Sequence, residues 1–347
     1  MKMKHWQWWL LVAIMSFFIL AGQTVGTILG RFYYDEGGNS KWMATFVQSA
    51  GSPLLLLPLL FLPSSTSPTN SVPNSFKSKV AIYILFGIVI ACNNLMYSYG
   101  LLFLPVSTYS LICATQLAFN AVFSYYINSE KLTAFVLNSV ILLTFSAALI
   151  GLHSSSESSN HVTGEKYALG FILTLAASAL FSLLLSLLQL TFEKYFKTMS
   201  FRVVFELQTC TSFIAACASV TGLFASGEWR SLRREMEEFK KGTEAYVMTL
   251  VWIAISWQMV SVGMVGLVFM ASSLLANMIG TLGLPLVPIF AVIFLNDRMD
   301  GVKVMALLIA IWGFLSYMYQ QYLDDSKAKK LATTDSMEIS VVPSSSL

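Results

Sequence analysis

Long apolar runs, separated by short polar segments, make up most of this sequence. A helix that crosses the ~30 Å hydrocarbon core of a bilayer needs ~20 mostly apolar residues. The pattern therefore predicts an all-α integral membrane protein with ten transmembrane helices. These predicted helices cover residues 8–29, 42–62, 80–104, 105–127, 132–152, 167–192, 203–226, 245–270, 271–295 and 304–323.

Two boundaries fall inside continuous apolar stretches, 80–127 and 245–295, each of which is long enough for two crossings. The first stretch is divided at Leu104-Pro105, because proline disfavours helix at the residue before it. The second stretch is divided near Ala271-Ser272, where an internal repeat supports the division.

The repeat joins two pairs of strings. GLLFLPVS from Gly100 resembles GLVFMASS from Gly266, and FSYYINSEKLT from Phe123 resembles FAVIFLNDRMDG from Phe290. Helices three to five therefore resemble helices eight to ten. A five-helix unit places its second copy upside down in the membrane, and this inverted design is common in secondary transporters, with the site at the repeat interface. The alternative is that two apolar hairpins resemble each other by composition alone.

The repeat divides the chain into three parts. Residues 1–160 form the first five-helix repeat, residues 161–323 form the second, and residues 324–347 form a polar cytoplasmic tail that we expect to be disordered. The polar segments 63–79 and 153–165 are predicted to be loops.

The segment 227–244 bears on orientation and on the membrane surface. When it is set aside, lysine and arginine counts favour both termini inside the cell. Its apolar residues follow helical spacing, which predicts a short amphipathic helix on the membrane; a solvated linker helix is the alternative. These residues are Trp229, Leu232, Met236 and Phe239.

Gly22, Gly26 and Gly30 lie four residues apart on one face of the first helix. Small residues at this spacing permit close contact between helices. We expect this face to pack against another helix of the same chain, with dimer formation as the alternative.

Composition narrows the function classes. Hydrophobic residues make up 56% of the chain and charged residues 11%, against roughly 25% charged in an average soluble protein. The net charge is only +3. These values exclude a disordered chain and an ordinary cytosolic enzyme, and they indicate a lipid bilayer rather than a nucleic acid as partner.

Catalytic and metal-binding patterns are absent from the sequence. All four cysteines fall inside predicted helices, the three histidines lie in loops or at the terminus, and no nucleotide-binding or hydrolase motif is present. We therefore expect no enzyme activity, no cofactor and no metal.

Amide and aromatic side chains recur inside the predicted helices. Asn93 and Tyr97 share one helix face, and Ser273, Asn277 and Thr281 share another. Each amide alone is explained by interhelical hydrogen bonding, but their number indicates a polar cavity. Amides can bond the donor–acceptor edge of adenine and aromatic rings stack on flat bases, so the pattern favours a neutral, planar nitrogen heterocycle.

Glu206 is the single charged residue inside the ten apolar runs. Intramembrane acids commonly mark proton relays or ion sites. We expect Glu206 to couple transport to protons, with an i−4 salt bridge to Arg202 as the alternative.

Specific strings within residues 8–323 resemble the plant purine permeases, a branch of the drug/metabolite transporter superfamily. The strings are GRFYYDEGGNSKWMATFVQSAGSPLL (30–55), NNLMYSYGLLFLPVSTYSLICATQLAFNAVFSYYINSEKLT (93–133), SFRVVFELQ (200–208), LVPIFAVIF (286–294) and KVMALLIAIWGF (303–314). The resemblance implies two inverted five-helix halves around a cavity and proton-coupled uptake of adenine-like bases and cytokinins. The cavity positions that it implies are Gln23, Trp42, Gln48, Asn94, Tyr97, Tyr109, Gln116, Glu206, Trp257 and Asn277.

The expected function is secondary active transport by alternating access, in the plasma membrane, with the tonoplast and endoplasmic reticulum as alternatives. A second hypothesis is a carrier of alkaloids or other heterocycles with the same fold. A third hypothesis is a receptor that binds a small molecule without moving it. A nucleotide-sugar carrier would need buried basic residues, and none lies within a predicted helix.

Overall fold

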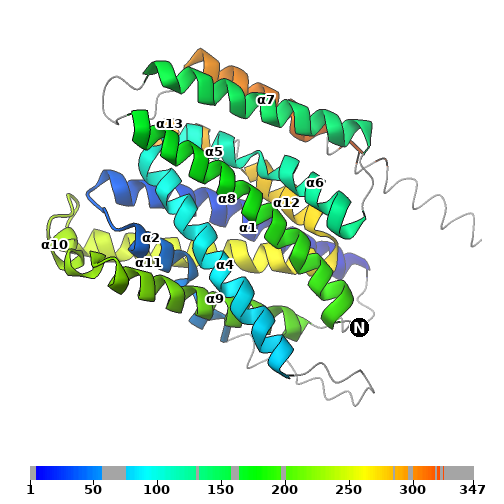
Figure 1. The fold of residues 1–347 in the computed structure, drawn as a ribbon, viewed down its shortest axis with the longest axis horizontal. Helices are drawn as coiled ribbons and strands as arrows, with labels where there is room; N and C mark the ends of the chain where they lie inside the picture. The colour runs from blue at the N-terminus through cyan, green and yellow to red at the C-terminus, as the bar shows by residue number, and fades with distance from the viewer. Residues whose placement is uncertain are drawn as a thin grey trace, which may run out of the picture.

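The computed structural model describes residues 5–56, 76–129, 133–157, 164–196, 201–283, 286–295, 300–316, 319–320 and 323. This part of the chain is built from helices and short connections, without strands. The long helices lie alongside one another in a bundle, with α10 at the end opposite the N-terminus of α1 (Figure 1). Residues 63–75 of the predicted loop 63–79 and the predicted tail 324–347 lie outside the described residues.

The helices follow the chain in two groups. The first group is α1 (His5–Asp35), α2 (Lys41–Ala50), the short helix η1 (Ser52–Leu55), α4 (Phe76–Phe103), α5 (Val106–Cys113), α6 (Gln116–Asn128) and α7 (Ala134–Glu157). The second group is α8 (Gly164–Leu190), η2 (Thr191–Phe196), α9 (Phe201–Ala225), η3 (Glu228–Arg230), α10 (Leu232–Glu237), α11 (Thr243–Met270), α12 (Ser273–Gly283), α13 (Leu286–Leu295) and a helix at Gly301–Ser316.

Six helices in the described ranges are long and apolar enough to cross a membrane. They span Trp6–Asp35, Lys77–Phe103, Val106–Asn128, Gly164–Tyr195, Arg202–Ala225 and Thr243–Met270. Each agrees with one of the predicted apolar runs. Helices of this length and apolar composition are typical of membrane crossings, so the chain is a multi-pass membrane protein.

Three predicted features differ from the structure. The predicted loop 63–79 is wrong at its end, because α4 begins at Phe76. The predicted loop 153–165 is wrong at its start, because α7 continues to Glu157. The predicted helix 105–127 contains a bend, since α5 ends at Cys113 and α6 begins at Gln116. Within the predicted helix 271–295 the structure describes α12 and α13, on either side of residues 284–285.

Glycines allow α1 and α11 to pack closely. A Cβ atom on Gly22 would lie 2.5 Å from the carbonyl oxygen of Ser256, and one on Gly263 would lie 2.7 Å from the carbonyl oxygen of Met15. Both distances are too short for any side chain, so each helix supplies glycine where the other backbone approaches. The prediction that the glycine face packs within the chain is confirmed.

The segment 227–244 packs on the protein itself. Phe239 is 3% exposed and contacts Tyr246 and Phe32, with ring centroids 5.4 Å and 6.3 Å apart. Met236 of α10 and Phe239 therefore pack against α1 and α11, whereas Trp229 is 45% exposed.

Candidate functional site

A central cavity of about 150 Å³ lies between α1, α2, α4, α8, α9 and α11 and the bend between α5 and α6. A single water needs only ~10–15 Å³ by the same measure, so the space is large enough for a small ligand. The lining mixes apolar side chains with amides and hydroxyls, and none of the described residues in it is charged.

Seven of the residues that the sequence predicted for binding line this cavity. They are Gln23, Gln48, Asn94, Tyr97, Tyr109, Gln116 and Trp257. They come from six different helices, so the fold brings together positions that lie far apart in the sequence.

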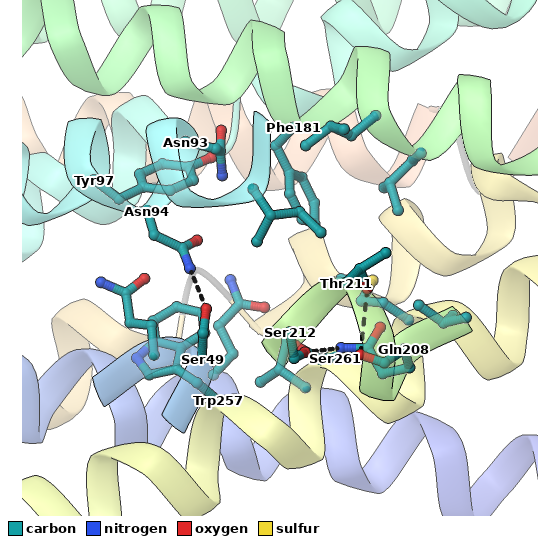
Figure 2. A pocket seen from close by; sticks show the side chains of 18 of the residues that line it. Ser49, Asn93, Asn94, Tyr97, Phe181, Gln208, Thr211, Ser212, Trp257 and Ser261 are labelled. Atoms are coloured by element: carbon teal, nitrogen blue, oxygen red, sulfur yellow. Dashed lines mark hydrogen bonds between the residues drawn. The ribbon is translucent and has the colours of Figure 1, made fainter. Parts of the chain in front are cut away.

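The amides of α2 and α4 form one wall through a short hydrogen-bond network. Asn94 Nδ2 donates to Ser49 Oγ at 3.2 Å, as Figure 2 shows. Gln48 Nε2 donates to Ser98 Oγ at 3.0 Å. These bonds fix the position of each amide and leave its oxygen available to a ligand.

Aromatic rings stand beside these amides. The rings of Tyr97 and Tyr109 meet edge to face with centroids 6.0 Å apart. Trp257 lies against α1, where a Cβ atom on Gly26 would be only 3.0 Å from the indole Nε1. The absence of a side chain at Gly26 therefore makes room for the indole at the cavity wall.

The bend between α5 and α6 places Gln116 at the cavity. Its backbone carbonyl oxygen accepts hydrogen bonds from Ser182 Oγ of α8 at 2.6 Å and from Asn277 Nδ2 of α12 at 3.1 Å. A carbonyl oxygen has two lone pairs, so it can accept such additional bonds, and these two bonds join α8 and α12 to the start of α6. Asn277 does not line the cavity; it is fully buried and supports the bend that carries Gln116.

Two cavity amides bury an oxygen that has no protein partner. These atoms are Asn93 Oδ1 and Gln23 Oε1, on residues that are 3% and 8% exposed. An unpaired buried carbonyl oxygen costs free energy unless water or a ligand bonds it. Asn93 is adjacent to the predicted Asn94, and its sharing of a face with Tyr97 was the signal that could have found it.

A second polar group lines the opposite wall. Gln208 Nε2 donates to Ser212 Oγ at 2.9 Å on α9, next to Thr211 and to Ser261 of α11 (Figure 2). The sequence analysis did not select these residues, although Gln208 stands two positions after Glu206. Two residues on a helix differ by ~200° in direction, so only one of the two can face the cavity.

Glu206 and Trp42 lie outside the cavity lining. The Glu206 side chain is exposed, and Tyr83 Oη of α4 lies 3.5 Å from its Oε1. The Trp42 ring packs on α9 at Gly222, where a Cβ atom would lie 2.2 Å from the ring. Trp42 therefore joins α2 to α9 rather than contacting the cavity.

Neutral polar atoms and rings define the chemistry of the cavity. The described residues contain no cluster of three or more His, Cys, Asp or Glu that could hold a metal. Without lysine or arginine at its wall, the cavity does not suit a phosphate. Amides beside rings suit a neutral, flat molecule with several hydrogen-bonding ring atoms.

Comparisons with known proteins agree with this chemistry. The family described as purine nucleobase transmembrane transport matches residues 10–327. The chain is 58% identical to probable purine permease 11 of Arabidopsis thaliana, over 95% of this chain and 87% of that one. It is 49% identical to purine permease 21 of the same plant, over 96% and 88% of the two chains.

A solved crystal structure shares the fold, with a TM-score of 0.53 at 13% identity, and the match covers 89% of this chain and 98% of the other. At this identity the likeness concerns the fold alone. The family match and the close relatives, together with the cavity, show that the chain belongs to the purine permeases, a family of membrane transporters for purine nucleobases.

Proposed function

We propose that this chain is a secondary active transporter that moves purine bases and related planar nitrogen heterocycles, such as adenine and cytokinins, by alternating access. In this proposal Gln23, Gln48, Asn94 and Gln116 bond the edge of the base. Trp257 and Tyr97 stack on its face, and Tyr109 supports Tyr97.

The observation that carries the proposal is the gathering of amides and aromatic rings at a cavity whose described lining is uncharged. Gln48, Asn94 and Gln116 bring amide groups to this wall, and Tyr97 and Trp257 bring rings. Amides can bond the edge of a purine, and rings can stack on its face.

We propose ten transmembrane helices arranged as two inverted repeats, 1–160 and 161–323. One observation supports this arrangement. The fourth predicted helix divides into α5 and α6 at a turn beside the central cavity. Discontinuous helices are typical of the sites of inverted-repeat transporters.

Proton coupling is the second part of the proposal, with Glu206 as the residue that takes up the proton. Its support is its place within the apolar helix Arg202–Ala225 and its proximity to the Tyr83 hydroxyl. Glu206→Gln is expected to abolish accumulation driven by an outside acid pH and to retain exchange of labelled base. Accumulation equal to that of the parent protein would contradict this role.

The test of the main proposal is uptake of labelled adenine in a yeast strain that lacks its own purine permeases. Uptake is measured at several pH values, with and without a protonophore, and with cytokinins and alkaloids as competitors. Time-dependent accumulation that adenine and cytokinins compete for supports the proposal. Stronger competition by alkaloids would support the alternative carrier, and binding without accumulation would support a receptor.

A matched pair of variants makes the test specific to the cavity. Asn94→Leu removes an amide that lines the cavity, whereas Asn138→Leu removes an exposed amide on α7, which bonds Ser316. We expect only Asn94→Leu to reduce uptake. Localisation of a fluorescent fusion tests the plasma membrane, with the tonoplast and endoplasmic reticulum as the alternatives.

A further inference from the structure

Two carboxylates join the connection between α1 and α2 to the connection between α9 and α11. We call this group the acid latch and define it as Glu228 and Glu235 with their partners Tyr33, Ser40 and Tyr246. It lies at the α10 end of the bundle, opposite the N-terminus of α1 (Figure 1).

Glu235 is the centre of the acid latch. It is 6% exposed and is the one buried carboxylate among the residues that the structure describes. Its Oε1 accepts hydrogen bonds from the hydroxyls of Tyr33 and, at 3.1 Å, Tyr246, and its Oε2 accepts one from the backbone N–H of Ser40 at 3.1 Å. Within the described part of the chain it forms no ion pair with lysine or arginine, so these three donors hold its charge.

Glu228 extends the same contact. Its Oε2 accepts from Ser40 Oγ at 2.7 Å and from the backbone N–H of Trp42 at 3.2 Å, and its Oε1 lies 3.4 Å from Lys41 Nζ. All these donors belong to the start of α2. The helix dipole favours a carboxylate that bonds backbone N–H groups at the N-terminus of a helix. Glu228 therefore also stabilises the N-terminus of α2.

The acid latch connects the two halves directly at this end through hydrogen bonds. Tyr33, Ser40 and Trp42 belong to the first repeat, and Glu228 and Glu235 belong to the second. Lys240 reinforces the connection, since its backbone N–H donates to the carbonyl oxygen of Glu36 at 3.0 Å. In an alternating-access transporter, contacts of this kind must break whenever this end opens.

A small space of about 20 Å³ lies between the acid latch and the central cavity. Four of the residues around it, Gln48, Tyr97, Tyr109 and Trp257, also line the central cavity. The Tyr33 ring forms part of its wall, while the Tyr33 hydroxyl bonds Glu235. Movement of Tyr33 away from Glu235 would therefore extend the central cavity toward the end of the bundle.

We propose that the acid latch is the gate that closes the central cavity at the α10 end, and that Glu235 is the positioning residue that holds it closed. Glu235 acts through Tyr33, which covers the small space above the binding residues. This inference rests on the proposed transport function, but its test measures access to the cavity and requires no substrate.

The native Cys113 provides the reporter, because it is buried and lines the central cavity. The background protein carries Ala in place of Cys92, Cys210 and Cys217, so that Cys113 is the remaining thiol. A charged, membrane-impermeant methanethiosulfonate is added to one side of the membrane at a time, using intact cells and inside-out vesicles. The measurement is the rate at which Cys113 reacts.

Glu235→Gln keeps the size of the side chain and replaces one acceptor oxygen with an NH₂ group, which cannot accept a hydrogen bond. We expect Cys113 to react about tenfold faster from the α10 side only, the effect of losing one hydrogen bond to a charged group. Tyr33→Phe, which keeps the ring and removes one donor, should give a smaller increase from the same side. It also provides the test if Glu235→Gln does not fold.

Two results would overturn the proposal. An unchanged rate in both variants would mean that the acid latch does not limit access, and an equal increase from both sides would mean general loosening of the bundle. Failure of purine uptake in the parent protein, with side-specific labelling intact, would instead contradict the transport proposal and leave the gate in place.

Discussion

In the central cavity, Asn93 and Gln23 each bury an oxygen without a protein partner, whereas in the acid latch both oxygens of Glu235 are bonded to protein donors. The cavity is uncharged and incompletely bonded, while the latch is charged and satisfied. An uncharged lining of amides and rings suits a neutral ligand, and satisfied acceptors stabilise one arrangement of the helices. The comparison therefore distinguishes the cavity residues, which are candidates for ligand binding, from the latch residues, which hold the helices in one arrangement.

The largest expected effect is the loss of the carboxylate at the centre of the latch. Glu235→Leu leaves the Tyr246 hydroxyl and the Ser40 N–H without their acceptor, and it leaves the Tyr33 hydroxyl with its longer bond, 3.4 Å, to the Ser40 carbonyl oxygen. Each buried donor left without an acceptor costs about 1–3 kcal/mol. We expect a large fall in the midpoint of thermal unfolding of the protein purified in detergent. A midpoint equal to the parent's would show that these bonds do not stabilise the closed arrangement.

The next effect concerns stacking in the cavity. Trp257→Leu keeps an apolar side chain and removes the ring, and stacking of one ring on a base contributes about 1–3 kcal/mol. We expect the affinity for adenine to fall by roughly 5- to 150-fold, measured by competition for labelled uptake or by titration of the purified protein. The midpoint of thermal unfolding is the control. If Trp257→Leu lowered the free energy of unfolding by as much as the free energy of adenine binding, Trp257 would have a packing role.

A smaller effect tests the unpaired amide. Asn93→Leu removes a buried oxygen that has no protein partner, so the apo protein should be as stable as the parent or more stable. Binding of adenine should weaken by about 2- to 10-fold, as for the loss of one neutral hydrogen bond. Asn94→Leu is the comparison, because it also loses the bond to Ser49 and should reduce stability as well as uptake. If both variants were less stable than the parent, the Asn93 amide would contribute to stability as the bonded Asn94 amide does, which would contradict this prediction.

Helix positions could be predicted from the sequence because the bilayer imposes a length and a composition on every crossing. The bend at residues 113–116 could not be predicted in the same way. The carbonyl oxygen of Gln116 is satisfied by Ser182 and Asn277, which lie far away in the sequence. The local sequence does not indicate partners this far away. In the sequence, an apolar run that contains a bend therefore looks the same as a straight helix.

The candidate site was predictable where residue type alone carries the information. Amides and rings inside the apolar runs predicted a polar cavity, and the resemblance to the purine permeases implied the seven residues that line it. Direction around a helix was harder to predict, and in FELQ the cavity receives Gln208 while Glu206 is exposed. Burial outside the apolar runs was not predictable at all. Glu235 stands in a charged loop, and only the tertiary packing of Tyr33 and Tyr246 buries it.

Glu237 should give the smallest effect, and it tests whether charge or geometry holds the latch. It lies on α10 two residues from Glu235, but its side chain is exposed, and its Oε1 pairs with Arg233 Nε at 2.9 Å. Exposed pairs of this kind contribute little because solvent and salt screen them. Glu237→Gln changes the net charge of the loop by the same amount as Glu235→Gln. We therefore expect an unchanged unfolding midpoint and an unchanged Cys113 labelling rate. If Glu237→Gln accelerated labelling as much as Glu235→Gln, the charge of the loop would hold this end closed, rather than the bonds of Glu235 to Tyr33, Tyr246 and Ser40.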